Sequence, residues 1–195
     1  MSRTFSITYD YLCPFARSAN ETIVEMLLAG ASHKVTFLPF SLTENHRQDG
    51  DTSQWDLPID LVGSGVLALL WSIAVRDGFS NSFLAFHVAL FSARHDDGAD
   101  INDQTLLHSV AESVGIDPGA VLSLVDTGVP AKTFAADHTS SAEEYEVFGV
   151  PTFIQGDEAV FVRFMNRHRP ADVERVLDML SWKNLNEFKR TSIER

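Results

Sequence analysis

The stretch DYLCPFA at residues 10–16 lies where the chain changes from strand periodicity to helix periodicity. Before it, residues 4–9 alternate apolar and polar side chains, which is the period of a half-buried strand. After it, apolar residues recur at three- and four-residue spacing up to Gly30, and Pro14 suits the first helical turn, where its missing N–H costs nothing. A second β-rich run at 34–40 completes a β-α-β unit, which predicts two parallel strands in one sheet.

The middle of the chain predicts a block of helices separated by Gly or Asp signals. They are expected over residues 57–78, 80–96, 102–115 and 120–126. Asn102 and Asp117 have the character of N-caps, and Pro118 after the second supports the start of a helix there. Gly63-Ser64-Gly65 matches part of a dinucleotide fingerprint, but it follows no strand, so we interpret it as a helix start.

The end of the chain predicts a return to the sheet. A helix is expected over 130–148, where Ser141 and Glu144 fit a capping box that would restart it and Gly149 ends it. Strands are expected at 152–155 and 159–163, joined by a turn at Gly156-Asp157, with a final helix from Pro170. The whole order predicts an α/β protein, with a core of residues 1–56 and 129–195 interrupted by an all-helical insertion at 57–128.

The composition limits the classes of partner. In 195 residues, 15 Lys and Arg stand against 27 Asp and Glu, which gives a net charge of −12 and disfavours nucleic acid and anionic membranes. The most apolar run, 65–75, is too short to span a bilayer, and the first residues lack the apolar segment of a secretory signal. We therefore expect a cytoplasmic protein with no nucleic-acid or membrane partner. A symmetric dimer is the commonest assembly of soluble proteins, so a homodimer is the assembly considered.

Cys13 is the only cysteine, so an intramolecular disulfide and a zinc site of several thiolates are excluded. Seven scattered histidines and the acidic run at 96–103 lack the spacing of metal ligands, so no metal site is expected. Cys13 lies between a strand end and a helix start, where free amides and the helix dipole favour a thiolate and lower the thiol pKa. The alternative is an inert, buried thiol.

Two motifs carry a resemblance to a known superfamily. CPFA (13–16) after the first strand resembles the active-site turn of the thioredoxin superfamily, and VFGVPTF (147–153) resembles its cis-proline loop. With a helical block between them, the arrangement is similar to the DsbA-like branch. The likeness is closer to mycothiol-dependent DsbA-like reductases, including those described as nitroreductases, through DYLCPFA, LPFSLTENHR (38–47), the cis-proline loop and NEFKRT (186–191).

The resemblance implies a thioredoxin-like fold with an inserted helical domain and a thiol-dependent oxidoreductase. It implies that Cys13 is the nucleophile and that the substrate or thiol contacts residues around it, namely Tyr11, Pro14, Phe15, Ala16, Val150 and Pro151. Ala16 departs from the family, because dithiol enzymes carry a resolving cysteine there. The resemblance therefore implies monothiol chemistry with an external low-molecular-weight thiol, such as mycothiol, as co-substrate and no tightly bound cofactor.

Two alternatives stay open. Glutathione transferase kappa and hydroxychromene-carboxylate isomerase are similar in arrangement and typically use a serine near this position to activate bound glutathione. A non-enzymatic thioredoxin-fold relic is the other alternative, and Ala16 is its best support.

Three further residues and a group of aromatic side chains each have two interpretations, either as part of the site or as ordinary structural residues. His138 could tune Cys13 or be a satisfied histidine. Arg163 and Arg167 belong to a cationic stretch, 163–169, that could hold an anionic substrate group or be solvated. Aromatic residues could line a cleft over Cys13 or form ordinary core, namely Tyr11, Phe15, Trp55, Trp71, Phe79, Phe83, Phe86 and Phe91.

Overall fold

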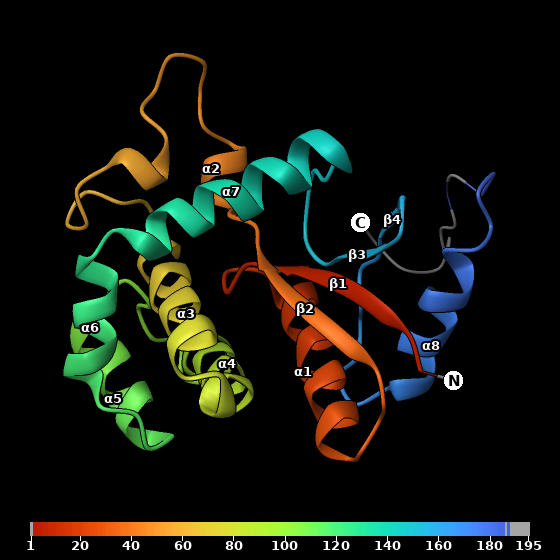
Figure 1. Ribbon diagram of the computed structural model, residues 1–195, viewed down its shortest axis with the longest axis horizontal. Coiled ribbons are helices and arrows are strands. Elements are labelled where there is room, and N and C mark those ends of the chain that lie inside the picture. The colour runs from red at the N-terminus through yellow and green to blue at the C-terminus, as the bar shows by residue number, and fades with distance from the viewer. Residues whose placement is uncertain (1, 186, 188–195) are drawn as a thin grey trace.

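The computed structural model of the protein describes residues 2–185 and 187. Within them, four strands form one sheet in the order β2-β1-β3-β4 (Figure 1). The strands are β1 (Thr4–Tyr9), β2 (Lys34–Pro39), β3 (Thr152–Gln155) and β4 (Glu158–Phe161). The central strand β1 runs parallel to β2 and antiparallel to β3, and β3 runs antiparallel to β4, so the predicted parallel pair is confirmed.

Three helices pack on the sheet. They are α1 (Pro14–Leu28), α7 (Val129–Glu144) and α8 (Pro170–Met179). Helix α1 contacts β1 and α8, while α7 contacts β2 and leads from the helical block back toward β3 (Figure 1). The apolar spacing of α8 buries Val173, Val176 and Leu177, as expected for an amphipathic helix on a sheet.

The remaining α-helices of the middle region gather beside the sheet. They are α3 (Val66–Gly78), α4 (Ser80–His95), α5 (Gln104–Ser113) and α6 (Pro118–Asp126). Helix α3 lies at their centre, because residues 66–75 are all buried and it contacts α4, α6 and α7. Helix α4 also packs on α1, which joins this block to the sheet (Figure 1). The predicted α/β architecture is confirmed.

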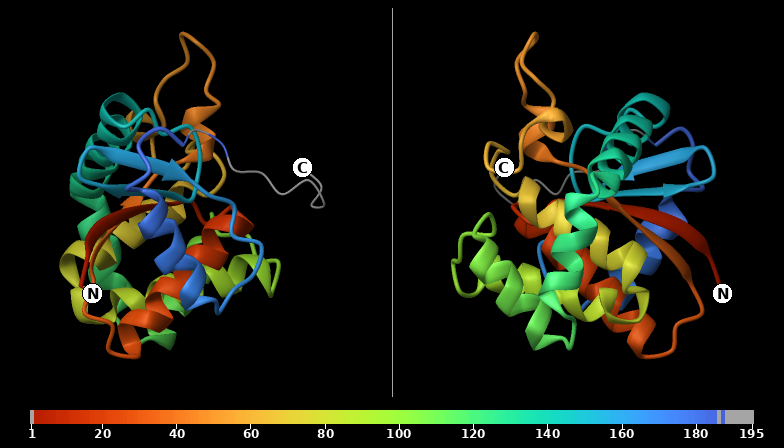
Figure 2. Two further views of the ribbon diagram at one scale, coloured as in Figure 1. Left: turned by 90° about the vertical axis from the view of Figure 1, so that its right-hand side faces the viewer. Right: turned by 60° about the vertical axis from the view of Figure 1, so that its left-hand side comes forward.

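A long connection joins β2 to the helical block. It contains the short helix α2 (Leu42–Asn45) and a single turn of 3-10 helix, Gln54–Asp56. Between these two, the chain projects away from the body of the molecule (Figure 2). None of the described helices has both the length and the apolar character needed to cross a bilayer.

The helix starts in the middle region differ from the prediction in two places. The expected helix at 57–78 begins only at Val66, because Gly65 before it has a positive φ of 78° and ends the preceding turns. Asn102 is not the N-cap of α5. Its side chain instead accepts a hydrogen bond from the Gly65 amide, and Asp103 caps α5 by accepting from Thr105. The predicted cap at Asp117 is confirmed.

Helix α7 and strand β4 also end earlier than predicted. Helix α7 stops at Glu144, because the backbone at Glu146 adopts a positive φ of 52°, which does not continue a helix. The predicted capping box is wrong, since the Ser141 hydroxyl donates to the Asp137 carbonyl inside the helix. Strand β4 covers Glu158–Phe161, so Arg163 follows the strand instead of ending it.

Candidate active site at the start of helix α1

Cys13 is the N-cap residue of α1, with Pro14 in the first turn. Its backbone N–H donates to the Asp10 carbonyl at 3.1 Å, and its carbonyl accepts from the Arg17 amide at 3.0 Å. These two bonds hold the turn between β1 and α1 and leave the amides of Phe15 and Ala16 directed at the Cys13 sulfur. Cys13 is buried, with 8% of its surface exposed, and this small exposed part is the opening through which a reagent must reach the thiol.

The loop before β3 faces this sulfur. The Val150–Pro151 peptide bond is cis, and the Cys13 thiol donates to the Val150 carbonyl at 3.4 Å. The loop is fixed on the sheet, because the Thr152 amide donates to the Thr8 hydroxyl at 2.8 Å. The structure therefore brings Cys13 together with Val150 and Pro151. Cys13 and Val150, which share the hydrogen bond, are 137 residues apart in the sequence.

The electrostatics of the thiol differ from the sequence expectation. Burial raises the pKa of Cys13 and outweighs the amides of Ala16 and Phe15, which lower it. The Asp10 carboxylate raises this pKa further, and the Arg163 guanidinium lowers it. The expected fall in the pKa of Cys13 is therefore wrong in direction, because depth in the fold outweighs the position at a helix start.

Asp10 is a site residue to which the sequence analysis gave no role. It is fully buried, and its carboxylate accepts from the Leu12 amide at 2.9 Å and from the Leu42 amide at 2.7 Å. Burial raises the pKa of Asp10 to about 6, although both hydrogen bonds lower it. The bond to Leu12, two residues along, is an Asx-turn that the sequence could have indicated. The bond to Leu42 is long-range and has no local signal.

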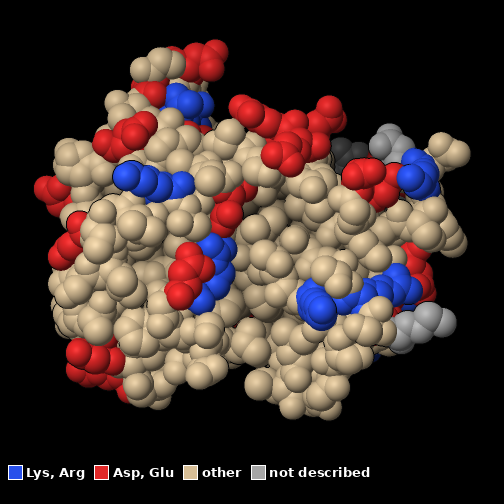
Figure 3. Space-filling view, in the orientation of Figure 1, with Lys and Arg blue, Asp and Glu red and all other residues tan. Residues whose placement is uncertain are grey.

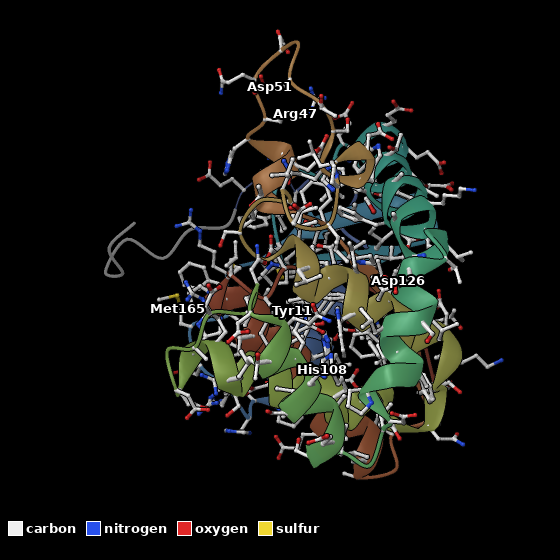
Figure 4. All side chains as sticks on the ribbon, turned by 90° about the vertical axis from the view of Figure 1, so that its left-hand side faces the viewer. Tyr11, Arg47, Asp51, His108, Asp126 and Met165 are labelled. Atoms are coloured by element: carbon white, nitrogen blue, oxygen red, sulfur yellow. The ribbon has the colours of Figure 1, made fainter. Side chains whose placement is uncertain are left out.

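Tyr11 lies on the inner side of the turn. Its ring is fully buried, and its hydroxyl lies 2.7 Å from both the Ser72 hydroxyl and Nδ1 of His87 (Figure 4). The expected contact between this ring and a substrate is corrected, because the ring is closed in by α3 and α4. Most aromatic residues of the block also form core, since Trp71, Phe83, Phe86 and Phe91 are buried, whereas Trp55 and Phe79 are partly buried.

His138 occupies a buried position on α7. Its ring stacks on Phe40 with centroids 4.3 Å apart, and Nδ1 accepts from the Ser41 amide at 3.2 Å. Burial lowers the pKa of His138 to about 4. The side chain is therefore a satisfied, neutral histidine, and the proposal that it tunes Cys13 is corrected.

The cationic stretch 163–169 divides into two parts. Arg167 donates to Glu21 at 3.0 Å, His168 contacts Glu25 at 2.9 Å and Arg169 lies 3.6 Å from Asp172. Arg163 behaves differently, because its guanidinium carbon lies 5.5 Å from the centroid of the Phe15 ring. The structure thus places Arg163 beside the active-site turn and holds Arg167 in an ion pair.

The outer rim of the turn is apolar and partly open. Phe148, directly before the cis-proline loop, is 67% exposed and packs on Phe161 with ring centroids 5.1 Å apart. A hollow of about 390 Å³ lies beside the first turns of α1. Its lining residues are Pro14, Arg17, Ser18, His95, Met165, Asn166 and Arg167, and Met165 is visible at the periphery in Figure 4. Ala16, in contrast, is fully buried.

Neither a cluster of metal ligands nor a patch of one charge marks a second site among the described residues and on the face drawn in Figure 3. Within residues 2–185 and 187, no three side chains of His, Cys, Asp or Glu converge as metal ligands. On the face drawn in Figure 3, acidic and basic side chains lie next to each other in several places and leave wide uncharged areas between them.

A cysteine at a helix start facing a cis-proline loop, beside a block of helices, has a counterpart in known proteins. The DSBA-like thioredoxin domain matches residues 4–177 of the chain. The protein belongs to this family. The conserved-domain match covers both motifs and the helical block between them, so the thioredoxin-like fold with inserted helices is shown.

Among relatives of this DSBA-like protein, YwbO of Bacillus subtilis (strain 168) is 23% identical over 172 residues, which are 77% of this chain and 86% of that protein. A 2-hydroxychromene-2-carboxylate isomerase superposes with a TM-score of 0.65 at 19% identity, covering 93% of this chain and 97% of that chain. The cytosolic disulfide reductase DsbM from Pseudomonas aeruginosa, with GSH, gives 0.62 at 17%, covering 93% and 100%. At this level of identity the two structures show the fold alone, and the reaction has to be inferred from the residues of the site.

Proposed function

We propose that this DSBA-like protein is a thiol-dependent oxidoreductase that works through Cys13 alone. The observation that carries the proposal is the pair formed by the Cys13 sulfur and the Val150 carbonyl, 3.4 Å apart, with a buried alanine at position 16. A thiol at a helix start opposite the backbone of a cis-proline loop can attack a disulfide that reaches it. Ala16 offers no second thiol, so the adduct must be resolved from outside.

The proposed reaction has two exchange steps. The Cys13 thiolate attacks one sulfur of a disulfide, a new bond to Cys13 forms, and the other sulfur leaves as a thiolate with the bonding electrons. An external low-molecular-weight thiolate then attacks the sulfur bound to Cys13, which releases Cys13 as a thiolate and carries the group away as a new disulfide. The amides of Phe15 and Ala16 and the charge of Arg163 stabilise the Cys13 thiolate in both steps.

We propose mycothiol as that external thiol, in the cytoplasm. The support is the resemblance in residues 10–16 and 38–47, which the structure places in contact. The Leu42 amide donates to Asp10 of the turn, and the Asn45 side chain donates to the Phe148 carbonyl at 3.2 Å, beside the cis-proline loop. The fourth part of that resemblance, 186–191, lies outside the described residues except for position 187.

The test is turnover of a mixed disulfide with added thiol, comparing mycothiol with glutathione. The wild type should turn over only when thiol is added, and Cys13→Ser should lose all turnover while it keeps its fold by circular dichroism. Ala16→Cys is the matched variant, because a second thiol one turn along should resolve the adduct without added thiol. Turnover that survives in Cys13→Ser would overturn the proposal.

A thiol-dependent isomerase or transferase is the second candidate, and one observation favours it. The raised pKa of Cys13 keeps the group protonated and donating to Val150, which suits a residue that hydrogen-bonds a bound thiol without attacking a disulfide. In that case Cys13→Ser would retain thiol binding and part of the activity, and no mixed disulfide would form on the wild type. Mass spectrometry of the protein after incubation with a disulfide separates the two candidates.

A further inference from the structure

Arg163 differs from the other cations of its segment in having no acidic partner. Arg167, His168 and Arg169 each lie within 4 Å of a carboxylate oxygen. Across residues 2–185 and 187, by contrast, Arg163 makes no ion pair. It is also exposed to solvent. In a chain with 27 acidic residues against 15 basic ones, Arg163 is thus a positive charge that has no carboxylate oxygen within 4 Å among the described residues.

This positive charge lies beside the active-site turn. The Arg163 guanidinium carbon is 5.5 Å from the centroid of Phe15, which is two residues after Cys13 in the first turn of α1. A cation over an aromatic face is held in place while its N–H groups stay free to bind other acceptors. The guanidinium is near enough to lower the pKa of Cys13. It is therefore near enough to attract an anion bound to that sulfur.

An apolar surface lies next to the loop that faces Cys13. Phe148 is largely exposed and rests on Phe161. Phe161 in turn fits closely on Gly149, where an added Cβ would lie 3.2 Å from its ring. Phe161 and Gly149 thus join the strand that precedes Arg163 to the loop that carries Val150. A planar aromatic group on a sulfur bound to Cys13 can pack on aromatic surface, while a negative charge on that group is attracted by the guanidinium.

We propose that Arg163, with Phe15 and Phe148, forms a subsite for an anionic aromatic group, such as a carboxylate on a ring, carried by the disulfide that Cys13 attacks. This inference rests on the proposed function, because it names the class of substrate that the same cysteine accepts. In the first exchange step the anionic half becomes bonded to Cys13, and the second half leaves as a thiolate. Arg163 is then a specificity residue for the half that stays.

Two disulfide probes of matched shape test the subsite. Dithiobis(nitrobenzoate) carries a carboxylate on each ring, and dithiodipyridine is aromatic and uncharged at neutral pH. Each releases a coloured thiol, and Cys13 is the only cysteine, so the rate of the first exchange step is read directly. The measured quantity is the rate constant for dithiobis(nitrobenzoate) divided by the rate constant for dithiodipyridine. A change in the thiolate fraction of Cys13 affects both rate constants equally and cancels in this ratio.

Arg163→Gln should lower this ratio about threefold to tenfold at low salt, the range for losing a charge-assisted contact at a partly exposed site. Added salt should lower the wild-type ratio toward the variant's value, because exposed charges are screened. Arg169→Gln is the matched control, because it removes the same charge from a residue that pairs with Asp172 instead of facing Phe15. Its ratio should stay that of the wild type.

An unchanged ratio in Arg163→Gln, or an equal fall in Arg169→Gln, would overturn the subsite. Failure of the native wild type to react with the neutral probe would instead overturn the proposed function. The subsite then has its own measurement, which is equilibrium dialysis of nitrobenzoate with Cys13→Ser, with and without Arg163→Gln. Weaker binding in the double variant supports the subsite, and equal binding overturns it.

Discussion

The two sides of the turn at residues 10–16 are built in opposite ways. On the inner side, Tyr11 joins a closed chain of hydrogen bonds in which each buried polar group has a partner. On the outer side, Arg163 has no acidic partner among the described residues and Phe148 faces solvent. The difference teaches that a turn can be fixed on one face by polar groups that all have hydrogen-bond partners. Groups without such partners on the other face are then held in place for a ligand.

The inner chain can be followed in one direction. The Tyr9 hydroxyl lies 2.9 Å from Ser72, Ser72 lies 2.7 Å from Tyr11, and Tyr11 lies 2.7 Å from Nδ1 of His87. Burial lowers the pKa of His87 to about 3, so the ring is neutral and one nitrogen accepts while the other donates. With Nδ1 accepting from Tyr11, Nε2 donates to the Asn20 side chain at 3.2 Å. The chain therefore ties β1, α3, α4 and α1 together.

The largest effect is expected when this chain is cut at its centre. His87→Ala should lower the free energy of unfolding by about 3–5 kcal/mol, because it leaves a cavity among aromatic rings and removes hydrogen bonds to Tyr11 and Asn20. Urea unfolding followed by circular dichroism measures it. The exposed His46→Ala serves as control and should stay within about 0.5 kcal/mol of the wild type. A loss below about 1 kcal/mol for His87→Ala would show that the inner side is not a structural anchor.

His87 of the inner side, with two other buried titratable groups, should also make stability depend on pH. The pKa of His87 is lowered to about 3 and that of His138 to about 4, against an unfolded value of about 6.5. Between pH 6.5 and about 4, the unfolded chain thus binds two protons that the folded chain does not, so stability falls on acidification. Asp10, raised to about 6, acts in the opposite sense, because the folded chain keeps a proton that the unfolded carboxyl loses.

His87, His138 and Asp10 together contribute, as two protons against one, a net slope of about 1.4 kcal/mol per pH unit between roughly pH 4.5 and 6, with stability rising as pH rises. Burial lowers the pKa of His95 as well, which adds to the slope in the same direction. Urea unfolding at a series of pH values measures this slope. His87→Asn removes one histidine with a lowered pKa, so its slope should be smaller than that of the wild type by about 1.4 kcal/mol per pH unit in the same range. Equal slopes in the two proteins would contradict the assignment to His87.

A smaller loss of stability is expected when one hydroxyl is removed from the inner chain. Tyr11→Phe keeps the ring but leaves Ser72 and His87 each short of a partner, which should lower the free energy of unfolding by about 1–2 kcal/mol. The rate of Cys13 alkylation should not change, because the Tyr11 ring is buried away from the opening. Tyr145→Phe is the control, with no change in stability expected. A changed alkylation rate in Tyr11→Phe would mean that the inner side also sets reactivity.

Two charges near the turn, those of Asp10 and Arg163, should act on Cys13 in opposite directions. The wild-type alkylation rate should reach half of its plateau at a higher pH than a free cysteine does, because burial raises the pKa of Cys13. Asp10→Asn should move that midpoint to lower pH, and Arg163→Gln should move it to higher pH. Asp49→Asn, in the exposed loop, should leave it in place. Shifts of the same sign in the first two variants would contradict the assignment of opposite charges.

Local signals were enough for the frame of the site. The alternation at 4–9, Pro14 after Cys13 and the spacing of apolar residues in α1 placed the cysteine at a helix start, where the structure has it. The motif at 147–153 placed Val150 and Pro151 before a strand, and β3 follows at Thr152. These features depend on neighbours within a few residues, which is the range over which sequence patterns determine conformation.

The rest depends on partners that no local pattern names. Arg163 and Arg167 are equivalent in sequence, and only the distant Glu21 separates them by pairing with Arg167. The direction of the Cys13 pKa failed for the same reason, because burial comes from the packed fold and outweighs the adjacent amides. Tyr11 was placed next to Cys13 by sequence, but the side to which its ring turns was set by His87, 76 residues away.

The smallest effect on stability is expected at the outer rim. Phe148→Ala should change the free energy of unfolding by no more than about 0.5 kcal/mol, since the side chain is 67% exposed and mainly covers Phe161. It should slow the reaction of Cys13 with the neutral aromatic disulfide a few-fold, because aromatic contact area at the opening is lost. Leu28→Ala, at an equally exposed position far along α1, should change neither quantity. A large loss of stability with unchanged reactivity would place Phe148 with the structural side of the turn, and the contrast between the two sides would fail.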